Sequence, residues 1–162
     1  MTFSAMFLAA LPIGIGATMV MDLWGLLLRR LGVGTLNFAL VGRWAGHALE
    51  GRMWHQAIAK AEPVRHELAW GWVIHYGIGV LFAMLLVVIV GEGWLQAPTL
   101  WPALGVGMGT VVAPLCFMQP VMGAGFFALK TPAPARNCLK SLLTHLVFGV
   151  GLFLSSALIT LF

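Results

Sequence analysis

The sequence predicts an all-α membrane protein with four transmembrane helices in a compact bundle. Three observations lead to this fold class. The chain of 162 residues is 60% hydrophobic and only 9% charged, whereas a soluble domain carries about 25% charged residues. Four largely uncharged segments approach or exceed the about 20 apolar residues that cross a bilayer. The nine Lys and Arg residues gather in the two segments that follow the first and third of these runs.

The first span is predicted at about residues 3–28. No charged side chain precedes Asp22, and the apolar run continues until Arg29 and Arg30 end it. The N-terminus has no basic segment before this run, which is also longer than the apolar part of a signal peptide, so we expect an uncleaved span. A carboxylate inside a span costs about 2–3 kcal/mol to insert, and Asp22 therefore marks a candidate functional site.

Residues 29–67 are predicted to be cytoplasmic because they hold most of the basic side chains. Within them, residues 40–61 have apolar side chains at roughly helical spacing, as at Leu40 and Trp44, with Arg43 off that face. This pattern favours an amphipathic helix in the membrane interface, its basic side toward anionic lipid headgroups. Three glycines in the segment leave a plain loop as the alternative.

The second span is predicted at about residues 68–91, uncharged apart from the titratable His75. Trp70 and Trp72 lie at its cytoplasmic end, where amphipathic rings favour the headgroup level. The side chains that we expect at the lipid interface are Arg29, Arg30, Arg43, Trp44, Trp70 and Trp72.

The third span is predicted at about residues 100–122 and the fourth at about residues 141–162, with a second cytoplasmic segment at 123–140. Pro114 and Pro120 should interrupt the third span, because proline cannot donate the backbone hydrogen bond of a helix. Each proline frees a carbonyl that needs another partner in the membrane.

The charge distribution predicts the topology and the partners. Basic segments on the inside place both termini on the outer side of a bacterial inner membrane. The net charge of +4 follows from this pattern, so we expect anionic lipid headgroups and no nucleic acid as partners. The whole chain, residues 1–162, is expected to form one integral membrane domain. Its glycine-rich helix faces would suit a homo-oligomer.

The two halves of the sequence resemble each other. His75-Tyr-Gly-Ile-Gly79 begins one even-numbered span and His145-Leu-Val-Phe-Gly149 the other. The odd-numbered spans share glycine-rich segments at Gly14–Thr18 and Gly105–Thr110. The pattern predicts a parallel repeat with two spans in each half.

Each predicted span offers one polar side chain at a similar depth. At 1.5 Å per residue, Asp22 and His75 lie about 10 Å inside the cytoplasmic boundary and His145 about 8 Å inside it. Gln119 belongs to roughly the same layer. We therefore predict a polar cluster of Asp22, His75, His145 and Gln119 near the cytoplasmic side.

The leading hypothesis is that this cluster binds a proton, an ion or a small polar solute, as in a small transporter or channel-like protein. Asp22 would be the charge centre, the histidines its proton partners, and Gln119 a group that orients the ligand. A structural or assembly scaffold, in which the same residues form a hydrogen-bonded clamp, is one alternative. A b-type haem held by His75 and His145 is another.

A divalent metal at Asp22, His75 and His145 is a further alternative. His47 and Glu50 lie three residues apart on the predicted interfacial helix, a spacing that suits shared metal ligation, with solvated side chains as the alternative. No cofactor is expected under the leading hypothesis. Because the sequence has no phosphate-binding loop, nucleophile elbow or metalloprotease motif, we expect a protein that is not an enzyme.

Several local strings together resemble an uncharacterised bacterial inner-membrane family, the domain of unknown function 2938. These strings are Met21-Asp22, Gly42-Arg43-Trp44, Gly71-Trp72 before His75-Tyr76, Met118-Gln119-Pro120 with Gly123-x-Gly125, and His145-x-x-Phe148-Gly149. The resemblance spans essentially the whole chain and implies a four-span membrane protein. It implies no activity, substrate or cofactor, but the four residues of the predicted cluster all lie in these strings.

Overall fold

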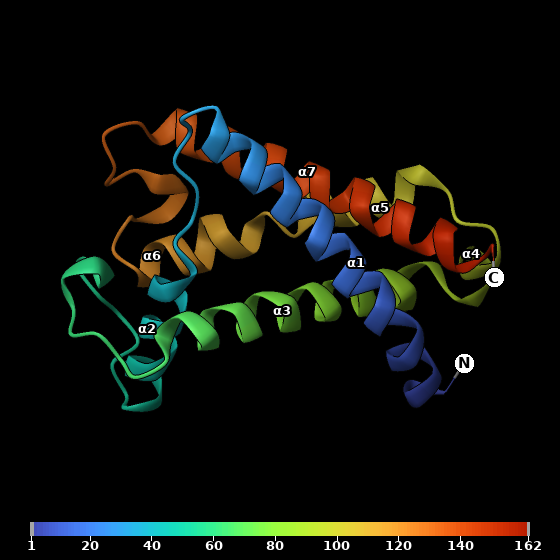
Figure 1. Ribbon diagram of the computed structural model, residues 1–162, viewed down its shortest axis with the longest axis horizontal. Helices are drawn as coiled ribbons and strands as arrows, with labels where there is room; N and C mark the ends of the chain where they lie inside the picture. Colours follow the sequence, from blue (N-terminus) through green and yellow to red (C-terminus); the bar gives the residue numbers. More distant parts are fainter. Residues whose placement is uncertain (1, 162) are drawn as a thin grey trace. The chain divides into compact units, whose positions relative to one another are not determined.

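The computed structural model describes residues 2–161, and within that range the regular secondary structure is entirely helical (Figure 1). Four of its helical segments are long and apolar enough to cross a membrane: α1 (Phe3–Arg30), α3 (Glu67–Val90), Leu100–Val121 and α7 (Pro134–Ile159). The all-α, four-span fold class is thereby confirmed. The largest difference from the predicted bounds is at the fourth span, which was predicted from about residue 141, whereas α7 begins at Pro134. The fixed φ of proline suits the first position of a helix.

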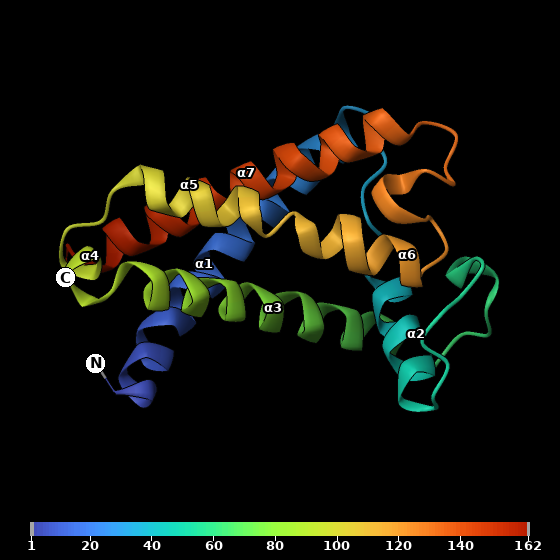
Figure 2. The same cartoon turned by 180° about the vertical axis from the view of Figure 1, so that it is seen from behind.

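The chain divides into two compact units. Unit 1 consists of Met1–Thr35, Tyr76–Thr110 and Leu143–Phe162, and unit 2 of Leu36–His75 and Val111–Leu142. The helices α1, α4 (Glu92–Gln96) and α5 (Leu100–Gly109) belong to unit 1, whereas α2 (Phe38–Leu49) and α6 (Gln119–Val121) belong to unit 2 (Figures 1 and 2). The helices α3 and α7 contribute to both units.

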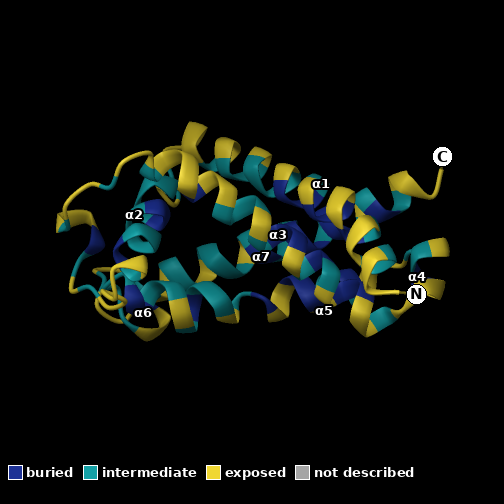
Figure 3. Ribbon diagram, turned by 90° about the horizontal axis from the view of Figure 1, so that it is seen from below, coloured by how far each residue is buried: buried dark blue, intermediate teal, exposed yellow. Residues whose placement is uncertain are grey.

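The core of unit 1 is built from apolar side chains of α1, α3, α4, α5 and α7, most of them small or branched. It comprises Ala10, Ile13, Ala17, Ala83, Leu86, Val87, Trp94, Ala103, Val106, Phe148 and Leu152. The same helices also expose large apolar side chains, and Leu23, Leu81 and Trp101 are 61–79% exposed. Figure 3 shows exposed and buried positions along the same helices. Helices that are apolar on both their inner and outer faces are typical of membrane spans. Four such helices indicate a multi-pass membrane protein.

Glycines set how closely the helices of unit 1 approach each other. A Cβ atom added to Gly14 of α1 would lie 2.5 Å from the Cα of Val80 and 2.8 Å from the carbonyl oxygen of Gly79 in α3. In the same way, a Cβ on Gly107 of α5 would lie 2.5 Å from the Cα of Gly149 in α7. In both helix pairs the close approach thus lies at a glycine of the segments that resemble each other in the two halves, and the internal repeat itself stays a prediction.

The segment between the first two spans forms a helix for only part of its length. Asn37 caps α2, its side chain accepting a 3.0 Å hydrogen bond from the amide of Ala39. The chain after α2 is irregular apart from a 3-10 turn at Ile58–Lys60. Within unit 2, α2 packs closely on the start of α3, since a Cβ on Gly42 would meet the Glu67 carbonyl. Of the two alternatives for residues 40–61, the helix therefore describes the part up to Leu49 and the loop most of the part after it; a location in the membrane interface stays a prediction.

The third span is not a continuous α-helix. After α5 the chain makes a turn and continues as a π-helix at Ala113–Met118, followed by the short α6. Pro114 lies at the start of the π-helix and has no N–H to donate to the carbonyl four residues earlier, so the α-helical register cannot pass through it. The chain then leaves the helix at Gly123, which has a φ of +99°. The interruption lies where the prolines predict one.

Candidate functional site

In unit 1, the only aspartate of the chain accepts a hydrogen bond from its only tyrosine. The hydroxyl of Tyr76 donates to Oδ2 of Asp22 over 2.9 Å, joining α1 to α3, and both residues are half-buried. A carboxylate among apolar helices needs such a donor, because an unpaired charge in a low dielectric is costly. The bond gives the intramembrane acid one defined partner.

The second polar pair of unit 1 joins the end of α5 to α7. The Thr110 hydroxyl donates to the carbonyl oxygen of Gly107 over 2.7 Å and lies 3.0 Å from Nδ1 of His145, which is 8% exposed. Because the hydroxyl has one proton and the carbonyl can only accept, the Thr110 oxygen accepts from His145 Nδ1–H. This bond fixes the tautomer of the neutral imidazole and leaves its basic lone pair on Nε2.

The contacts between α1 and α7 set the level of these two pairs along unit 1. Gly151 of α7 packs against Ala17 and Val20 of α1, and one turn further along α7 the Ser155 side chain meets Gly16. The two helices are therefore antiparallel. Counting onward from this contact, five residues along α1 reach Asp22 and six residues back along α7 reach His145. The two residues lie within about one helical turn of the same level.

His75 lies in unit 2, at the boundary with unit 1, and packs against aromatic rings. Its ring centroid is 4.3 Å from that of Phe38 and 5.8 Å from that of Trp72, and Phe38 and Trp72 are themselves 4.4 Å apart. Gln119, also in unit 2, follows the π-helix, and its buried Oε1 has no hydrogen-bond partner. Asp22 and His145 belong to unit 1, so a single cluster of all four residues stays a prediction.

Sequence reasoning did not select Tyr76 and Thr110 as site residues, although they are the hydrogen-bond partners of Asp22 and His145. Both carried a usable signal. Tyr76 directly follows His75, at the depth of the predicted polar layer. Thr110 carries a hydroxyl within the predicted third span, two residues after Met108. A threonine hydroxyl in an apolar helix is commonly bonded to its own helix, as Thr110 is to Gly107, so the residue type alone did not indicate a site.

The side chains expected at the lipid interface have varied surroundings. Arg29 and Arg30 are exposed, and Trp70 is 56% exposed. By contrast, Arg43 pairs within unit 2 with both carboxylate oxygens of Glu67, each at 2.8 Å, and with the carbonyl oxygens of residues 59 and 61. That hydrogen bond to the carboxylate raises the pKa of Arg43.

The two tryptophans that remain of this set also make internal contacts in unit 2. Trp44 donates through Nε1 to the carbonyl oxygen of Met53 over 3.0 Å. Trp72, 37% exposed, packs its ring on Phe38. Contact of these side chains with lipid stays a prediction.

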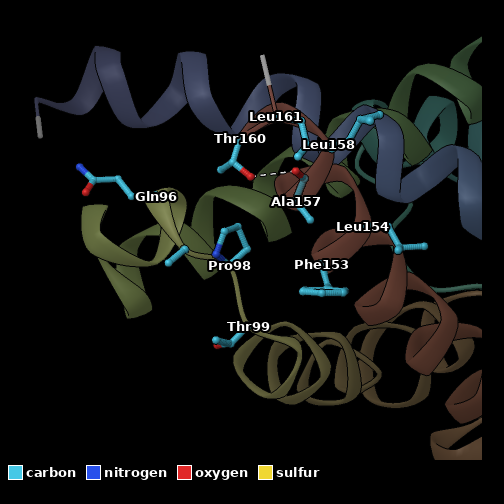
Figure 4. A pocket seen from close by; sticks show the side chains of 10 residues that line it. Gln96, Pro98, Thr99, Phe153, Leu154, Ala157, Leu158, Thr160 and Leu161 are labelled. Carbon is cyan, nitrogen blue, oxygen red and sulfur yellow. Dashed lines mark hydrogen bonds between the residues drawn. The ribbon is translucent and has the colours of Figure 1, made fainter.

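The metal and haem hypotheses receive no support from the described part of the chain. Within residues 2–161, there is no group of three or more His, Cys, Asp or Glu side chains that could hold a metal ion. An open pocket of about 590 Å³ in unit 1 is lined by residues 96–99 and by side chains between Phe153 and Leu161 (Figure 4). Its lining has no acid and no histidine, so it offers no proton-exchanging or metal-binding group.

Comparison with known proteins gives one result. The family model for a protein of unknown function, DUF2938, matches residues 11–159, which include the intramembrane acid and both polar pairs of unit 1. No curated protein and no solved structure matches the chain. The chain, with its four apolar helices and its Asp22–Tyr76 bond, therefore belongs to the DUF2938 family.

Proposed function

We propose that this chain is a non-enzymatic inner-membrane protein whose intramembrane polar groups bind a proton, an ion or a small polar solute, in the manner of a small transporter. The Asp22–Tyr76 bond carries the proposal. A carboxylate in a 28-residue apolar helix is costly unless it is used or satisfied. Here the Tyr76 hydroxyl of α3 donates to it, which joins the acid to a second helix of unit 1.

The second polar pair supports the same reading. By helix register, His145 and Asp22 are within about one turn of the same level of unit 1. Histidine side chains exchange protons near neutral pH, and proton relays inside membranes are commonly built from histidine and carboxylate side chains. Asp22 would be the charge centre and His145 its proton partner. His75 and Gln119 belong to unit 2 and are not part of this pair of unit 1.

The orientation follows from the charges. The basic segments 29–67 and 123–140 would face the cytoplasm and contact anionic lipid headgroups, with both termini outside. The polar layer would then open toward the cytoplasm.

The test is proton flux into proteoliposomes that contain the purified protein and a trapped pH-sensitive dye. A potential imposed with K⁺ and valinomycin should acidify wild-type vesicles faster than vesicles with the Asp22→Asn variant. Glu92→Gln is the matched control, since it converts an exposed carboxyl of unit 1 to an amide. A sodium or potassium gradient in place of the potential distinguishes coupled ions from protons alone.

A structural clamp is the competing function, because in each polar pair the two side chains hydrogen-bond to each other. In that case Asp22→Asn and His145→Gln would lower the unfolding temperature and leave flux equal to that of Glu92→Gln. Equal flux in wild-type, Asp22→Asn and protein-free vesicles would refute proton transport. Reduced flux with a near-normal unfolding temperature is the result that the proposal expects.

A further inference from the structure

The loop between α6 and α7 in unit 2 exposes three large apolar side chains (Figure 2). Phe126, Phe127 and Leu129 are 54%, 50% and 70% exposed, whereas Ala128 between them is buried. Residues 126–129, called the apolar turn below, form a 3-10 turn and its C-terminal cap. Exposed apolar side chains that are gathered in one place commonly mark a surface that contacts a membrane or another protein.

The backbone of the apolar turn has an uncommon conformation that the surrounding chain enforces. Phe127 and Ala128 have φ values of +51° and +57°, in the left-handed region that residues other than glycine rarely enter. The Cys138 thiol donates to the carbonyl oxygen of Phe127 over 3.1 Å. The Thr131 hydroxyl donates to that of Ala128 over 2.7 Å. Strained backbone of this kind gathers at functional sites, and here it keeps the large apolar side chains exposed.

The charge around the apolar turn has one sign. Residues 111–142 of unit 2 include Lys130, Arg136 and Lys140 and no acidic residue. Lys130 directly follows the turn and is exposed. Its side-chain carbons lie against Gly125, where an added Cβ would be 2.9 Å from Cγ. A basic side chain that packs its stem and keeps its ammonium group in water suits the boundary between acyl chains and anionic headgroups.

The place of the apolar turn in the chain favours a lipid surface. The third candidate span ends at Val121 and the fourth begins at Pro134, so the connection between them is short. It is also folded back on itself. The Ala124 amide donates to the carbonyl oxygen of Gln119 over 2.8 Å, and the Lys130 amide donates to that of Ala124 over 2.9 Å. A short loop closed in this way keeps its side chains near the ends of the two spans, where the headgroups lie.

We propose that the apolar turn is an interfacial anchor, which inserts Phe126, Phe127 and Leu129 among the acyl chains of an anionic lipid surface and places Lys130 and Arg136 at the headgroups. Phenylalanine and leucine beside basic side chains are the usual composition of segments that lie in a membrane interface. The proposal rests on the membrane orientation given under the proposed function and is independent of proton binding. The anchor would hold unit 2 against the bilayer beside the interrupted third span.

The test is nitroxide spin labelling of the full-length protein in vesicles of phosphatidylcholine and phosphatidylglycerol. The label is attached at Leu129→Cys, and Cys116→Ser and Cys138→Ser remove the native thiols while a hydroxyl at residue 138 can still donate to the turn. Ala133→Cys is the matched control, because Ala133 is exposed in the same loop beyond the apolar turn. Power saturation compares the access of O₂, which concentrates among acyl chains, with that of a water-soluble nickel chelate. The ratio of O₂ to nickel access should be several-fold higher at residue 129 than at residue 133.

A second measurement tests the charges and the apolar side chains separately. Replacing phosphatidylglycerol by phosphatidylcholine should lower the access ratio at residue 129, because the anionic headgroups are lost. Lys130→Gln combined with Arg136→Gln should remove this difference between the two lipids. Phe126→Ser combined with Phe127→Ser should lower the ratio in both lipids. Each variant is compared with the labelled parent at matched elution volume and helical circular dichroism, so that a change reports insertion and not unfolding.

The outcomes separate this proposal from its alternatives. Equal access ratios at residues 129 and 133 in the labelled parent would overturn it, and the apolar turn would then be a surface for a protein partner. A ratio at residue 129 that does not respond to phosphatidylglycerol would overturn the role of Lys130 and Arg136. The access ratio is a local property of the loop, so an aqueous apolar turn leaves the result of the flux assay standing. Likewise, absence of proton flux leaves the expected ratio unchanged.

Discussion

Substituting alanine for Gly107 tests whether α5 and α7 cross at this glycine, next to the Thr110–His145 pair of unit 1. The added Cβ would lie 2.5 Å from the Cα and 2.7 Å from the amide nitrogen of Gly149, and 2.8 Å from the carbonyl oxygen of His145. Ordinary van der Waals contact begins at 3.4 Å, so the helices must separate by about 1 Å. The obstructing atoms are backbone, and no rotamer change can relieve them. Overpacking of this kind costs about 1–3 kcal/mol.

Gly105→Ala is the matched control on the same helix, because nothing lies within 4 Å of its added Cβ. Alanine there should be neutral or stabilise α5 by up to about 1 kcal/mol through helix propensity. Thermal unfolding in one detergent, followed by tryptophan fluorescence, measures both variants. At about 2–4 °C per kcal/mol for a chain of this size, Gly107→Ala should melt several degrees below Gly105→Ala. Equal melting temperatures would mean that α5 and α7 do not cross at this glycine.

Three further predictions concern individual polar contacts. Arg43→Lys keeps the charge but loses the bidentate hydrogen bond to Glu67. The free energy of unfolding, measured by denaturant titration, should therefore fall by about 1–2 kcal/mol. Amide hydrogen exchange at residues 59–61 should become faster, because Arg43 also bonds to the carbonyl oxygen of Ala61. Tyr76→Phe removes the hydroxyl that donates to the intramembrane acid and should cost about 1–3 kcal/mol; an unchanged melting curve would show that this bond adds no stability. The hydrogen bond from Arg52 lowers the pKa of Glu50, so this pair stabilises the fold above the ordinary carboxyl pKa of 4.5 and is lost as the pH falls through the lowered value. Arg52→Ala should raise the Glu50 pKa in a carbon-13 NMR titration, and no change would contradict the pairing.

The sequence alone determined the number and approximate place of the spans. Hydropathy is a sum over neighbouring residues, and the cost of placing charge in lipid is large, so an uncharged run such as residues 3–21 has few other outcomes. The same holds for the interruption of the third span, since Pro114 lacks an amide proton in any context. The choice of Asp22 as a site residue also followed from its local setting.

That Tyr76 meets Asp22 was decided only by the tertiary structure. Neighbouring residues point about 100° apart around a helix, so whether the Tyr76 side chain reaches Asp22 depends on how α3 is rotated. That rotation is set by the backbone contact of Gly14 with Gly79 and Val80. Depth can be counted along one helix from its boundary, whereas rotation is fixed by packing against another helix. For the same reason the Thr110–His145 bond and the contact of His47 with His55 were visible only once the helices were assembled.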